Sequence, residues 1–239
     1  MNNYLVIGNG FIGNIVAKYL NCQIHKGRIE TLEDAKKACQ GYEVIINCAG
    51  LASVDLCEEQ PDQAIKENVL LPLLLKMSCS YLVHFSTGCL ADGTLWPRDK
   101  IKSFSMYGKT KLLGESYADL VLRIRIPFGS MEHPREFITK LKKFSFADPS
   151  YQSFTCIDDM LPVMHDLILK RDEGIRHLVN KGTISPYEMA KYMKVFLPMI
   201  GDNPGKVKRV SAILECPEIN IDVFHSFRKI IERRGYGTI

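Results

Sequence analysis

Three side chains of this sequence have the types and the spacing that proton-transfer chemistry requires. Tyr107 and Lys111 are four residues apart in a segment with a helical pattern, so both side chains share one face of the predicted helix. An ammonium beside a phenol favours the phenolate and lowers the tyrosine pKa from its ordinary ~10, which would make Tyr107 a usable proton donor and acceptor. Thr87 adds a hydroxyl near the end of a predicted strand. Taken alone, a Tyr-x-x-x-Lys spacing more often marks a surface pair, so its meaning depends on what surrounds it.

A glycine-rich turn near residue 8 predicts a binding site for a dinucleotide. Gly8, Gly10 and Gly13 form a G-x-G-x-x-G sequence directly after the apolar run 4–7, and they open a predicted helix. The first glycine permits the tight turn, the second lets the backbone approach a pyrophosphate, and the third lets helix and strand pack closely. The free N–H groups at the start of the helix, around Phe11 and Ile12, can then bind the anion.

The residues after the second predicted strand bear on which nicotinamide cofactor binds. An NAD site prefers Asp or Glu about 20 residues beyond the glycine turn, whereas this chain has His25, Lys26, Gly27 and Arg28 there. Cations suit a 2′-phosphate, so Lys26 and Arg28 favour NADPH, with NADH as the alternative. A charged loop tip is also commonly just solvated, and the sequence does not decide between these two interpretations.

The elements that must position these residues alternate between short apolar strands and longer helices. Strands are predicted at 4–7, 22–25, 44–47, 81–85 and 120–124, with helices between them near 11–20, 30–39, 61–79 and 106–118. This alternation is typical of an α/β fold with a doubly wound parallel sheet of the Rossmann type. Ligands of such sheets bind in the crevice outside the carboxyl ends of the strands, where the glycine turn and Thr87 are expected.

Beyond residue 125 the alternation loosens, and a second, smaller lobe is predicted that is interwoven with the first. Residues 1–125 are expected to form the dinucleotide-binding core, to which 151–180 return with a helix and a strand at 175–179. Residues 126–150 and 181–239 are expected to form a small substrate-binding lobe, mostly helical from residue 185 onward. The basic run 228–234 is most simply the solvated side of a terminal helix.

Length, charge and cysteine content narrow the class of protein. The chain has 239 residues and a net charge of +4, from 31 Lys and Arg against 27 Asp and Glu, which suits an anionic small molecule and not a nucleic acid. The longest apolar run, 69–75, falls far short of the ~20 residues of a membrane span, and no basic segment typical of a secretory signal precedes the first strand. The eight cysteines show no zinc-like spacing, so we expect no metal site and a reducing, cytoplasmic location.

Taken together, the glycine turn, Thr87 and the Tyr107–Lys111 pair resemble the extended short-chain dehydrogenase/reductase superfamily. Within it, the chain is similar to dTDP-4-dehydrorhamnose reductases, and more similar to the bifunctional nucleotide-4-keto-6-deoxyglucose 3,5-epimerase/4-reductases that make UDP-rhamnose. The likeness is carried by Asn47-Cys48-Ala49-Gly50, Val83-His84-Phe85-Ser86-Thr87-Gly88-Cys89, Tyr107-Gly108-Lys109-Thr110-Lys111-Leu112, Leu122-Arg123-Ile124-Arg125-Ile126-Pro127 and His133-Pro134-Arg135. The loop between Cys89 and Tyr107 is shorter than is usual in the family, and so is the chain.

The resemblance implies two further proton-transfer residues. Family members that dehydrate the sugar place Asp-Glu after the threonine, whereas this chain has Gly88 and Cys89, so 4,6-dehydration is not expected. Cys89 and Lys140 match the acid/base pair of the epimerases, which inverts C3 and C5 of a 4-keto sugar by removing and returning protons. The alternatives are that Cys89 is a small core residue and that Lys140 belongs to a solvated basic helix.

The resemblance also implies the remaining contacts and the overall reaction. The cofactor groove is expected to include Asn47, Ala49, Gly50, Asn68, Pro127 and Phe128, and Arg135 is expected at the substrate diphosphate. The implied reaction converts UDP- or dTDP-4-keto-6-deoxyglucose to the L-rhamnose nucleotide with NADPH, in functional coupling to a 4,6-dehydratase. The alternatives are a 4-dehydrorhamnose reductase without epimerase activity and a non-catalytic NAD(P)-binding regulatory subunit. The sequence does not decide the oligomeric state, and a homodimer is one option.

Overall fold

A parallel sheet with helices on both faces forms the centre of the computed structural model, which describes residues 3–144, 146–194, 199–200 and 209–236. Within these residues the sheet has seven strands in the order β13-β10-β6-β4-β3-β1-β2, and every neighbouring pair is parallel. The strands are β1 (Tyr4–Ile7), β2 (Gln23–His25), β3 (Val44–Asn47), β4 (Leu82–Thr87), β6 (Leu120–Ile124), β10 (Gly174–Lys181) and β13 (Pro217–Asp222). The predicted fold class, α/β and doubly wound, is confirmed.

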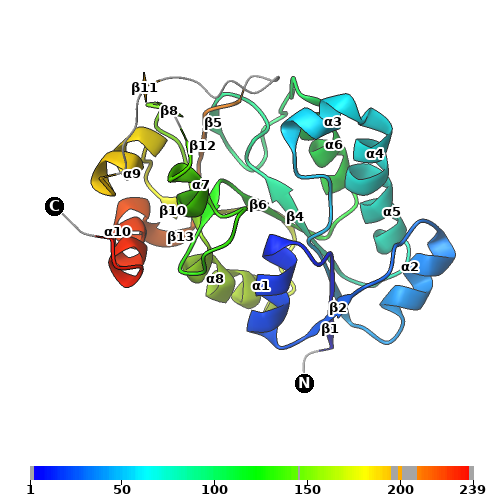
Figure 1. Ribbon diagram of the computed structural model, residues 1–239. Helices are drawn as coiled ribbons and strands as arrows, with labels where there is room; N and C mark the ends of the chain where they lie inside the picture. Colours follow the sequence, from blue (N-terminus) through cyan, green and yellow to red (C-terminus); the bar gives the residue numbers. More distant parts are fainter. Residues whose placement is uncertain (1–2, 145, 195–198, 201–208, 237–239) are drawn as a thin grey trace.

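The helices divide between the two faces of the sheet. Helices α1 (Phe11–Leu20) and α8 (Ile157–Leu169) lie side by side on one face (Figure 1). The other face carries α2 (Leu32–Cys39), α3 (Val54–Glu59), α4 (Pro61–Ile65), the π-helical turn η1 (Lys66–Leu70), α5 (Leu71–Lys76) and α6 (Met106–Glu115). Because the chain passes from β1 to β2 in one direction and then to β3 in the other, a crevice opens beyond the carboxyl ends of β1 and β3.

The central strands are apolar because both of their faces are covered. Alternate side chains of β1 and β3 point to opposite faces, so Val6 and Ile46 pack in the cluster that contains α1 and α8. Leu5 and Ile45 pack on the other side, with residues of α2 and α5 such as Leu75. The core therefore continues through the sheet and fixes the positions of the strand ends.

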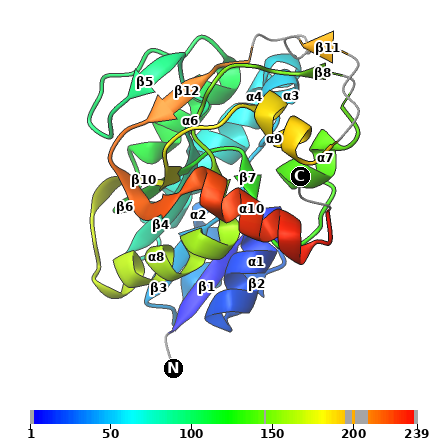
Figure 2. The ribbon, with the colours of Figure 1, turned by 90° about the vertical axis from the view of Figure 1, so that its left-hand side faces the viewer.

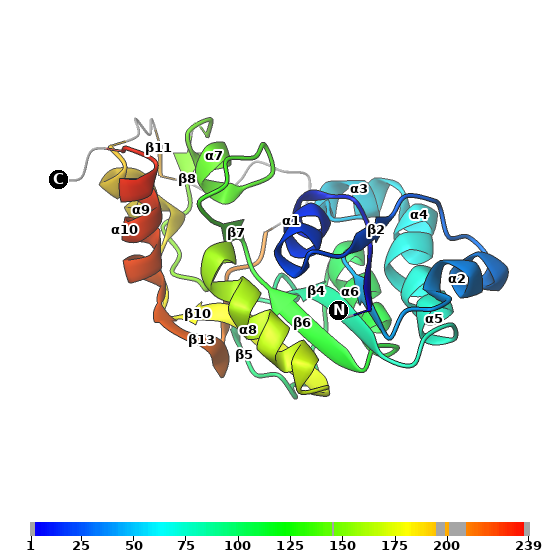
Figure 3. The same ribbon diagram turned by 90° about the horizontal axis from the view of Figure 1, so that it is seen from below.

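A second cluster of apolar side chains joins segments that are far apart in the sequence. The short helices α7 (Phe137–Leu141) and α9 (Pro186–Tyr192) gather with α10 (Val223–Arg233) beyond the β13 edge of the sheet, as Figures 2 and 3 show. Phe128, Phe137, Phe154 and Phe227 form the aromatic part of this cluster. Strands β7 (Pro127–Phe128) and β9 (Thr155–Cys156) connect it to the carboxyl end of β6.

Three of the predicted details are wrong. The helix expected at 61–79 consists of α4, η1 and α5 and ends at Lys76. The described residues beyond 185 are not mostly helical, because β12 (Ala212–Leu214) pairs with β5 (Gly93–Leu95) and β13 is an edge strand of the main sheet; the predicted turn at 201–205 lies outside the described residues. Arg234 is not solvated, since its side chain is only 4% exposed against Glu136.

Membrane spans and metal clusters are both absent from the part of the chain that the structure describes. None of the helices there has the length and apolarity needed to cross a bilayer. Nor do three or more His, Cys, Asp or Glu side chains come together among the described residues as they would around a metal ion.

Candidate active site

The glycine turn forms a tightly packed junction between β1, α1 and the loop after β3. Gly8 has a φ of +100°, and a Cβ added to it would lie 2.6 Å from the backbone nitrogen of Ala49. A Cβ on Gly13 would lie 1.9 Å from the carbonyl oxygen of Gly8, so only glycine lets α1 approach the turn this closely. The geometry matches the reasons for which the sequence placed glycine at these two positions.

The start of α1 is open to an anion. Gly10 is the N-cap, no side chain caps the helix, and its first turn carries no acidic residue. The nearest atom to a Cβ on Gly10 would be Nη1 of Arg135, at 3.9 Å. Phe11 stacks on His133 with ring centroids 4.6 Å apart, which holds the Arg135 loop over the turn. Arg135, expected at the substrate diphosphate, therefore also lies beside the place for a cofactor pyrophosphate.

A cavity of about 610 Å³ extends from the glycine turn past the ends of β2 and β3. Lys26, Arg28, Ala49 and Gly50, which were predicted to bind cofactor, are among its lining residues. The sequence analysis assigned no cofactor contact to several others, among them Asn9, Gln63, Leu70 and Leu74 and the acidic Glu30 and Glu67. Three leucines of η1 and α5 line this cavity: Leu70, Leu71 and Leu74. The sequence could have indicated them, because they lie on the predicted helix that follows β3 and borders the crevice.

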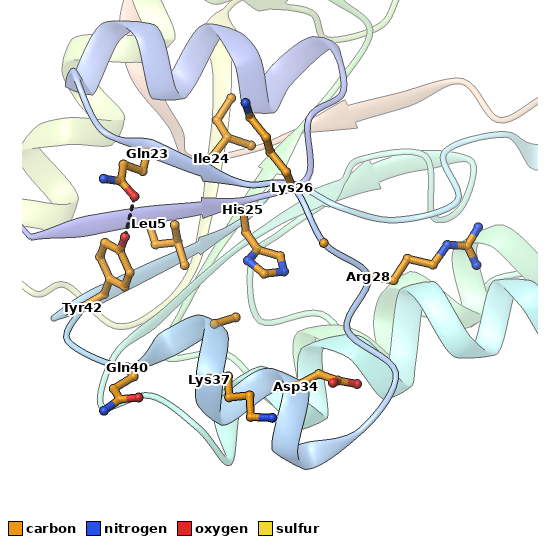
Figure 4. A pocket seen from close by; sticks show the side chains of 12 residues that line it. Leu5, Gln23, Ile24, His25, Lys26, Arg28, Asp34, Lys37, Gln40 and Tyr42 are labelled. Atoms are coloured by element: carbon orange, nitrogen blue, oxygen red, sulfur yellow. Dashed lines mark hydrogen bonds between the residues drawn. The ribbon is translucent and has the colours of Figure 1, made fainter.

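A second cavity of about 540 Å³ lies between β2 and α2 and shares residues 25–28 with the first. Figure 4 shows the ring of His25 directed into it, towards Asp34 and Lys37 of α2, while Lys26 points away from that helix. Arg28 extends in a different direction again (Figure 4). Lys26 and Arg28 thus line both cavities at the end of β2. Asp34 also lines the second cavity and Glu30 the first, and Arg28 pairs with Glu30 at 3.6 Å, so a contact of the two cations with a 2′-phosphate stays a prediction.

Tyr107 and Thr87 meet at the carboxyl end of β4. Ser105 caps α6 by accepting a hydrogen bond from the Gly108 N–H at 3.1 Å, and Tyr107 follows in the first turn. The phenol of Tyr107 lies beside the Thr87 hydroxyl, which acts to lower the tyrosine pKa and whose Oγ1 accepts from the Cys89 N–H at 3.0 Å. The two residues predicted to polarise a carbonyl therefore lie in contact.

The predicted effect of Lys111 on Tyr107 is wrong in this structure. Burial raises the pKa of Tyr107 above its ordinary value, and only the Thr87 hydrogen bond and the Arg125 charge oppose this. Lys111 turns away from the phenol and into the sheet, where its Nζ donates to the Phe85 carbonyl at 2.8 Å. Burial lowers the pKa of Lys111 to about 8. Helical spacing placed both residues on one face but could not give the direction of the lysine side chain.

Asn47 and Asn68 shape the loop that lines the groove. Asn47 Oδ1 accepts from the Ala49 N–H at 3.0 Å, and Asn68 Oδ1 accepts from the Leu51 N–H at 2.9 Å. The amide nitrogen of Asn68 donates to Oγ1 of Thr110 on α6 at 3.1 Å. Both asparagines hold residues 47–51 against their neighbours, and a direct contact of either with a cofactor stays a prediction.

Cys89 lies against a buried arginine that the sequence analysis assigned no role. Arg125 is 1% exposed, and its Nη1 donates to the Cys89 sulfur at 3.1 Å and to the Gly88 carbonyl at 3.3 Å. Its Nη2 donates to Gln152 and to the carbonyl of Val210. A charged residue within the apolar run 120–126 is the signal that could have revealed it. The residue after it, Ile126, has a φ of +38°, a strained conformation for a β-branched side chain beside the site.

The remaining predicted residues lie on β7 and α7, which follow β6 in the chain. Lys140 is exposed on α7, where nearby protein atoms and the Arg135 guanidinium lower its pKa. No hydrogen bond joins it to Cys89 within the described part of the chain, so their pairing stays a prediction. Phe128 is fully buried in the aromatic cluster, and Pro127 is half-buried. If these two residues approach a nicotinamide as predicted, the contact is made mainly by the backbone of β7 and not by the Phe128 side chain.

Known proteins are similar to this chain in sequence and in fold. Residues 16–214 match the model of the RmlD substrate binding domain family. The chain is 27% identical over 226 residues to the trifunctional UDP-glucose 4,6-dehydratase/UDP-4-keto-6-deoxy-D-glucose 3,5-epimerase/UDP-4-keto-L-rhamnose-reductase RHM1 of Arabidopsis thaliana, covering 81% of this chain and 34% of that protein. It is 26% identical to the bifunctional dTDP-4-dehydrorhamnose 3,5-epimerase/dTDP-4-dehydrorhamnose reductase of the same plant, covering 82% of this chain and 75% of that one. The chain thus spans about a third of the length of the trifunctional relative.

Solved structures give the same fold. The L780 UDP-rhamnose synthase of Acanthamoeba polyphaga mimivirus superposes with a TM-score of 0.87 at 22% identity, over 96% of this chain and 98% of that one. A dTDP-4-dehydrorhamnose reductase of Bacillus anthracis str. Ames in complex with NADP gives 0.77 at 18% identity, over 98% of both chains. Because the family model covers most of the sequence, the resemblance inferred from the motifs is confirmed, and the chain belongs to the RmlD substrate binding domain family.

Proposed function

We propose that this protein is an NADPH-dependent reductase of a nucleotide-linked 4-keto-6-deoxy sugar, with NADH as a second usable cofactor. The observation that carries the proposal is the contact between Thr87 and Tyr107 at the end of β4, next to a glycine turn open to an anion. Family membership and the activities named for the relatives support the same reaction. The intact Tyr107–Lys111 pair speaks against a non-catalytic regulatory subunit, which has no need of a placed proton donor.

The residues of the crevice fit a dinucleotide. The close approach of α1 at Gly8 and Gly13, the uncapped helix start and the cavity of about 610 Å³ provide a phosphate site with an adjoining space. We assign the pyrophosphate to residues 8–13 with Arg135 above them, and the 2′-phosphate to Lys26 and Arg28. When bound, the cofactor supplies a hydride to the sugar carbonyl carbon.

The protein's own part in reduction is to hold the carbonyl and supply a proton. Thr87 and Tyr107 donate hydrogen bonds to the carbonyl oxygen, and Tyr107 transfers its proton as the oxygen gains charge. Because burial raises the pKa of Tyr107, the phenol is protonated and ready to donate at neutral pH. Lys111 holds the nicotinamide ribose.

We further propose that Cys89 and Lys140 epimerise C3 and C5 before reduction. A carbonyl at C4 makes the protons of both carbons acidic, and inversion needs one group on each side of the ring. The contact of Cys89 with the Arg125 guanidinium supports this, because a bond of 3.1 Å to Nη1 fixes the position of the sulfur at the site. Reduction without epimerisation is the alternative outcome. In either case the substrate is made by a 4,6-dehydratase, since this chain lacks the Asp-Glu that dehydration needs.

The test is product analysis with purified protein, NADPH and either UDP- or dTDP-4-keto-6-deoxyglucose. Oxidation of NADPH is expected, and Tyr107→Phe should lower kcat by roughly 10²–10⁴-fold. Tyr117→Phe, just beyond the carboxyl end of α6, serves as the matched control. Cys89→Ser should abolish deuterium uptake from solvent at C3 and C5, with Cys216→Ser as its control. If NADPH binds but no nucleotide sugar is reduced, the reductase proposal is wrong. If deuterium still enters at the normal rate in Cys89→Ser, the epimerase proposal is wrong.

A further inference from the structure

A histidine in the middle of the sheet connects the cofactor loop to Lys111. His84 lies in β4 with no exposed surface, between apolar neighbours Val83 and Phe85. Its Nδ1 is 3.0 Å from Nδ2 of Asn47 on β3, and its Nε2 is 3.2 Å from Nζ of Lys111 on α6. The three side chains form a continuous polar line from β3 through β4 to α6.

The backbone fixes the protonation pattern of this line. The N–H of Ala49 can only donate, so the Asn47 atom that it meets at 3.0 Å must be the amide oxygen. The Asn47 atom that faces His84 is therefore the NH₂ group, which donates to Nδ1. A ring nitrogen that accepts carries no proton, so neutral His84 carries its proton on Nε2.

This tautomer directs an N–H at Lys111. If Lys111 is an ammonium, two donors face each other across 3.2 Å. If Lys111 is a neutral amine, its lone pair accepts the His84 Nε2–H, while an amine hydrogen bonds the Phe85 carbonyl at 2.8 Å. Every contact in the line is then a donor–acceptor pair, which is the condition for a buried polar network to be stable.

We propose that His84 is a positioning residue that stabilises the neutral amine of Lys111, through a tautomer imposed by Asn47 and the Ala49 N–H. His84 thereby sets the pH at which the Lys111 amine, assigned above to the nicotinamide ribose, loses its proton in the working enzyme, and its Nε2–H then bonds the lone pair left on Nζ. This kinetic consequence rests on the proposed function. The protonation pattern itself does not.

Opposing influences on the pKa of Lys111 leave both its charged and its neutral form accessible. Burial lowers the pKa of Lys111 to about 8, while Glu115 on α6, Cys48 after β3 and Cys57 on α3 act in the opposite direction. Burial by itself holds the pKa of His84 below its ordinary value, and a charged Lys111 lowers it further, so the ring stays neutral in either state of the lysine. His84 can therefore donate a hydrogen bond to Lys111 but does not itself become protonated.

Two measurements on the unmodified protein test the proposal first. Nitrogen NMR of histidine-labelled protein is expected to show His84 with its proton on Nε2. Competitive acetylation across pH, read by mass spectrometry at the Lys111 peptide, should give a reactivity midpoint at least one unit below the ordinary lysine value of about 10.4, with exposed Lys109 as the internal reference. A proton on Nδ1, or an ordinary midpoint, overturns the proposal without any variant.

A double-variant cycle then isolates the tautomer. Asn47→Asp keeps the side-chain shape but can only accept from His84, so the proton moves to Nδ1 and Nε2 becomes an acceptor for the ammonium. The Lys111 midpoint should rise by about one unit with His84 present, and by less than half as much in the His84→Phe background, where the new carboxylate acts through its charge alone. Equal shifts in the two backgrounds overturn the proposal.

Kinetics separate this inference from the proposed function. In an active reductase, the basic limb of the kcat–pH profile should move with the Lys111 midpoint in Asn47→Asp, whereas KM should change little. If the acetylation midpoint moves as expected but no nucleotide sugar is reduced, the protonation pattern stands and the reductase proposal fails. If the sugar is reduced while the midpoint does not move, the reductase stands and the role of His84 is wrong.

Discussion

Removing Glu115 should destabilise the protein strongly, because it is one half of a buried ion pair. Arg123 donates from Nε and Nη2 to the two carboxylate oxygens at 2.9 and 2.7 Å, and the side chains are 2% and 6% exposed. Ser86 adds a hydrogen bond to the same carboxylate at 2.5 Å. Glu115→Leu leaves the guanidinium without a counter-charge, so we expect a loss of about 3–5 kcal/mol in the free energy of unfolding. Urea titrations followed by circular dichroism measure it.

The double variant Glu115→Leu/Arg123→Met tests the reasoning, because it removes both buried charges and keeps similar volumes. It should be clearly more stable than Glu115→Leu alone, since no uncompensated charge is left. As a matched control, Asp166→Asn breaks an ion pair whose side chains are 67% and 57% exposed, and its effect should stay below about 1 kcal/mol. A loss of less than about 1 kcal/mol in Glu115→Leu, or a double variant no more stable than it, would contradict the account of the pair.

Three further predictions concern the turn, the lobe and the response to pH. In Gly13→Ala the new Cβ would lie 1.9 Å from the carbonyl oxygen of Gly8, so both thermal stability and NADPH binding, followed by fluorescence, should decrease. In Gly10→Ala the nearest atom to the new Cβ is 3.9 Å away, so NADPH binding should decrease while thermal stability stays unchanged. Arg234→Met leaves Glu136, which is 0% exposed, without its ion pair; hydrogen exchange at 129–141 should accelerate, unlike in the exposed Arg228→Met. Burial lowers the pKa of His177 to about 4, so between pH 4 and 6.5 the imidazole takes up a proton in the unfolded chain but not in the folded one. The urea concentration at the unfolding midpoint should therefore decrease as the pH is lowered through this range, and it should decrease less in His177→Gln.

Local patterns predicted the part of the site that local geometry determines. The spacing of Gly8 and Gly13 after an apolar strand was enough to predict the turn, because the contacts that require each glycine lie at the same strand–turn–helix unit. The meeting of Thr87 with Tyr107 was also predictable, since a parallel sheet brings the end of β4 to the start of α6. Family resemblance added Cys89, which has no local signature of its own.

What could not be predicted depends on packing between distant segments. The direction of the Lys111 side chain follows from His84 and the Phe85 carbonyl, which no spacing rule contains. The role of Arg125 arises from a contact with Cys89, 36 positions away. Strands β5 and β12 are three residues each, too short to be distinguished from loop by alternation, and they exist because they pair with one another.

The π-helical turn at residues 66–70 has a consequence for how a site of this kind can change. Compared with an α-helix, such a turn accommodates an extra residue, and each added or lost residue rotates the rest of the helix by about 100°. Asn68 reaches both the Leu51 backbone and Thr110 from within that local widening. A one-residue deletion here would leave an ordinary α-helix in which the Asn68 side chain points in another direction. The loop after β3 would then lose the hydrogen bonds through which Asn68 connects it to α6. The length of an inconspicuous helix, and not only the residues in the crevice, therefore sets the shape of the groove.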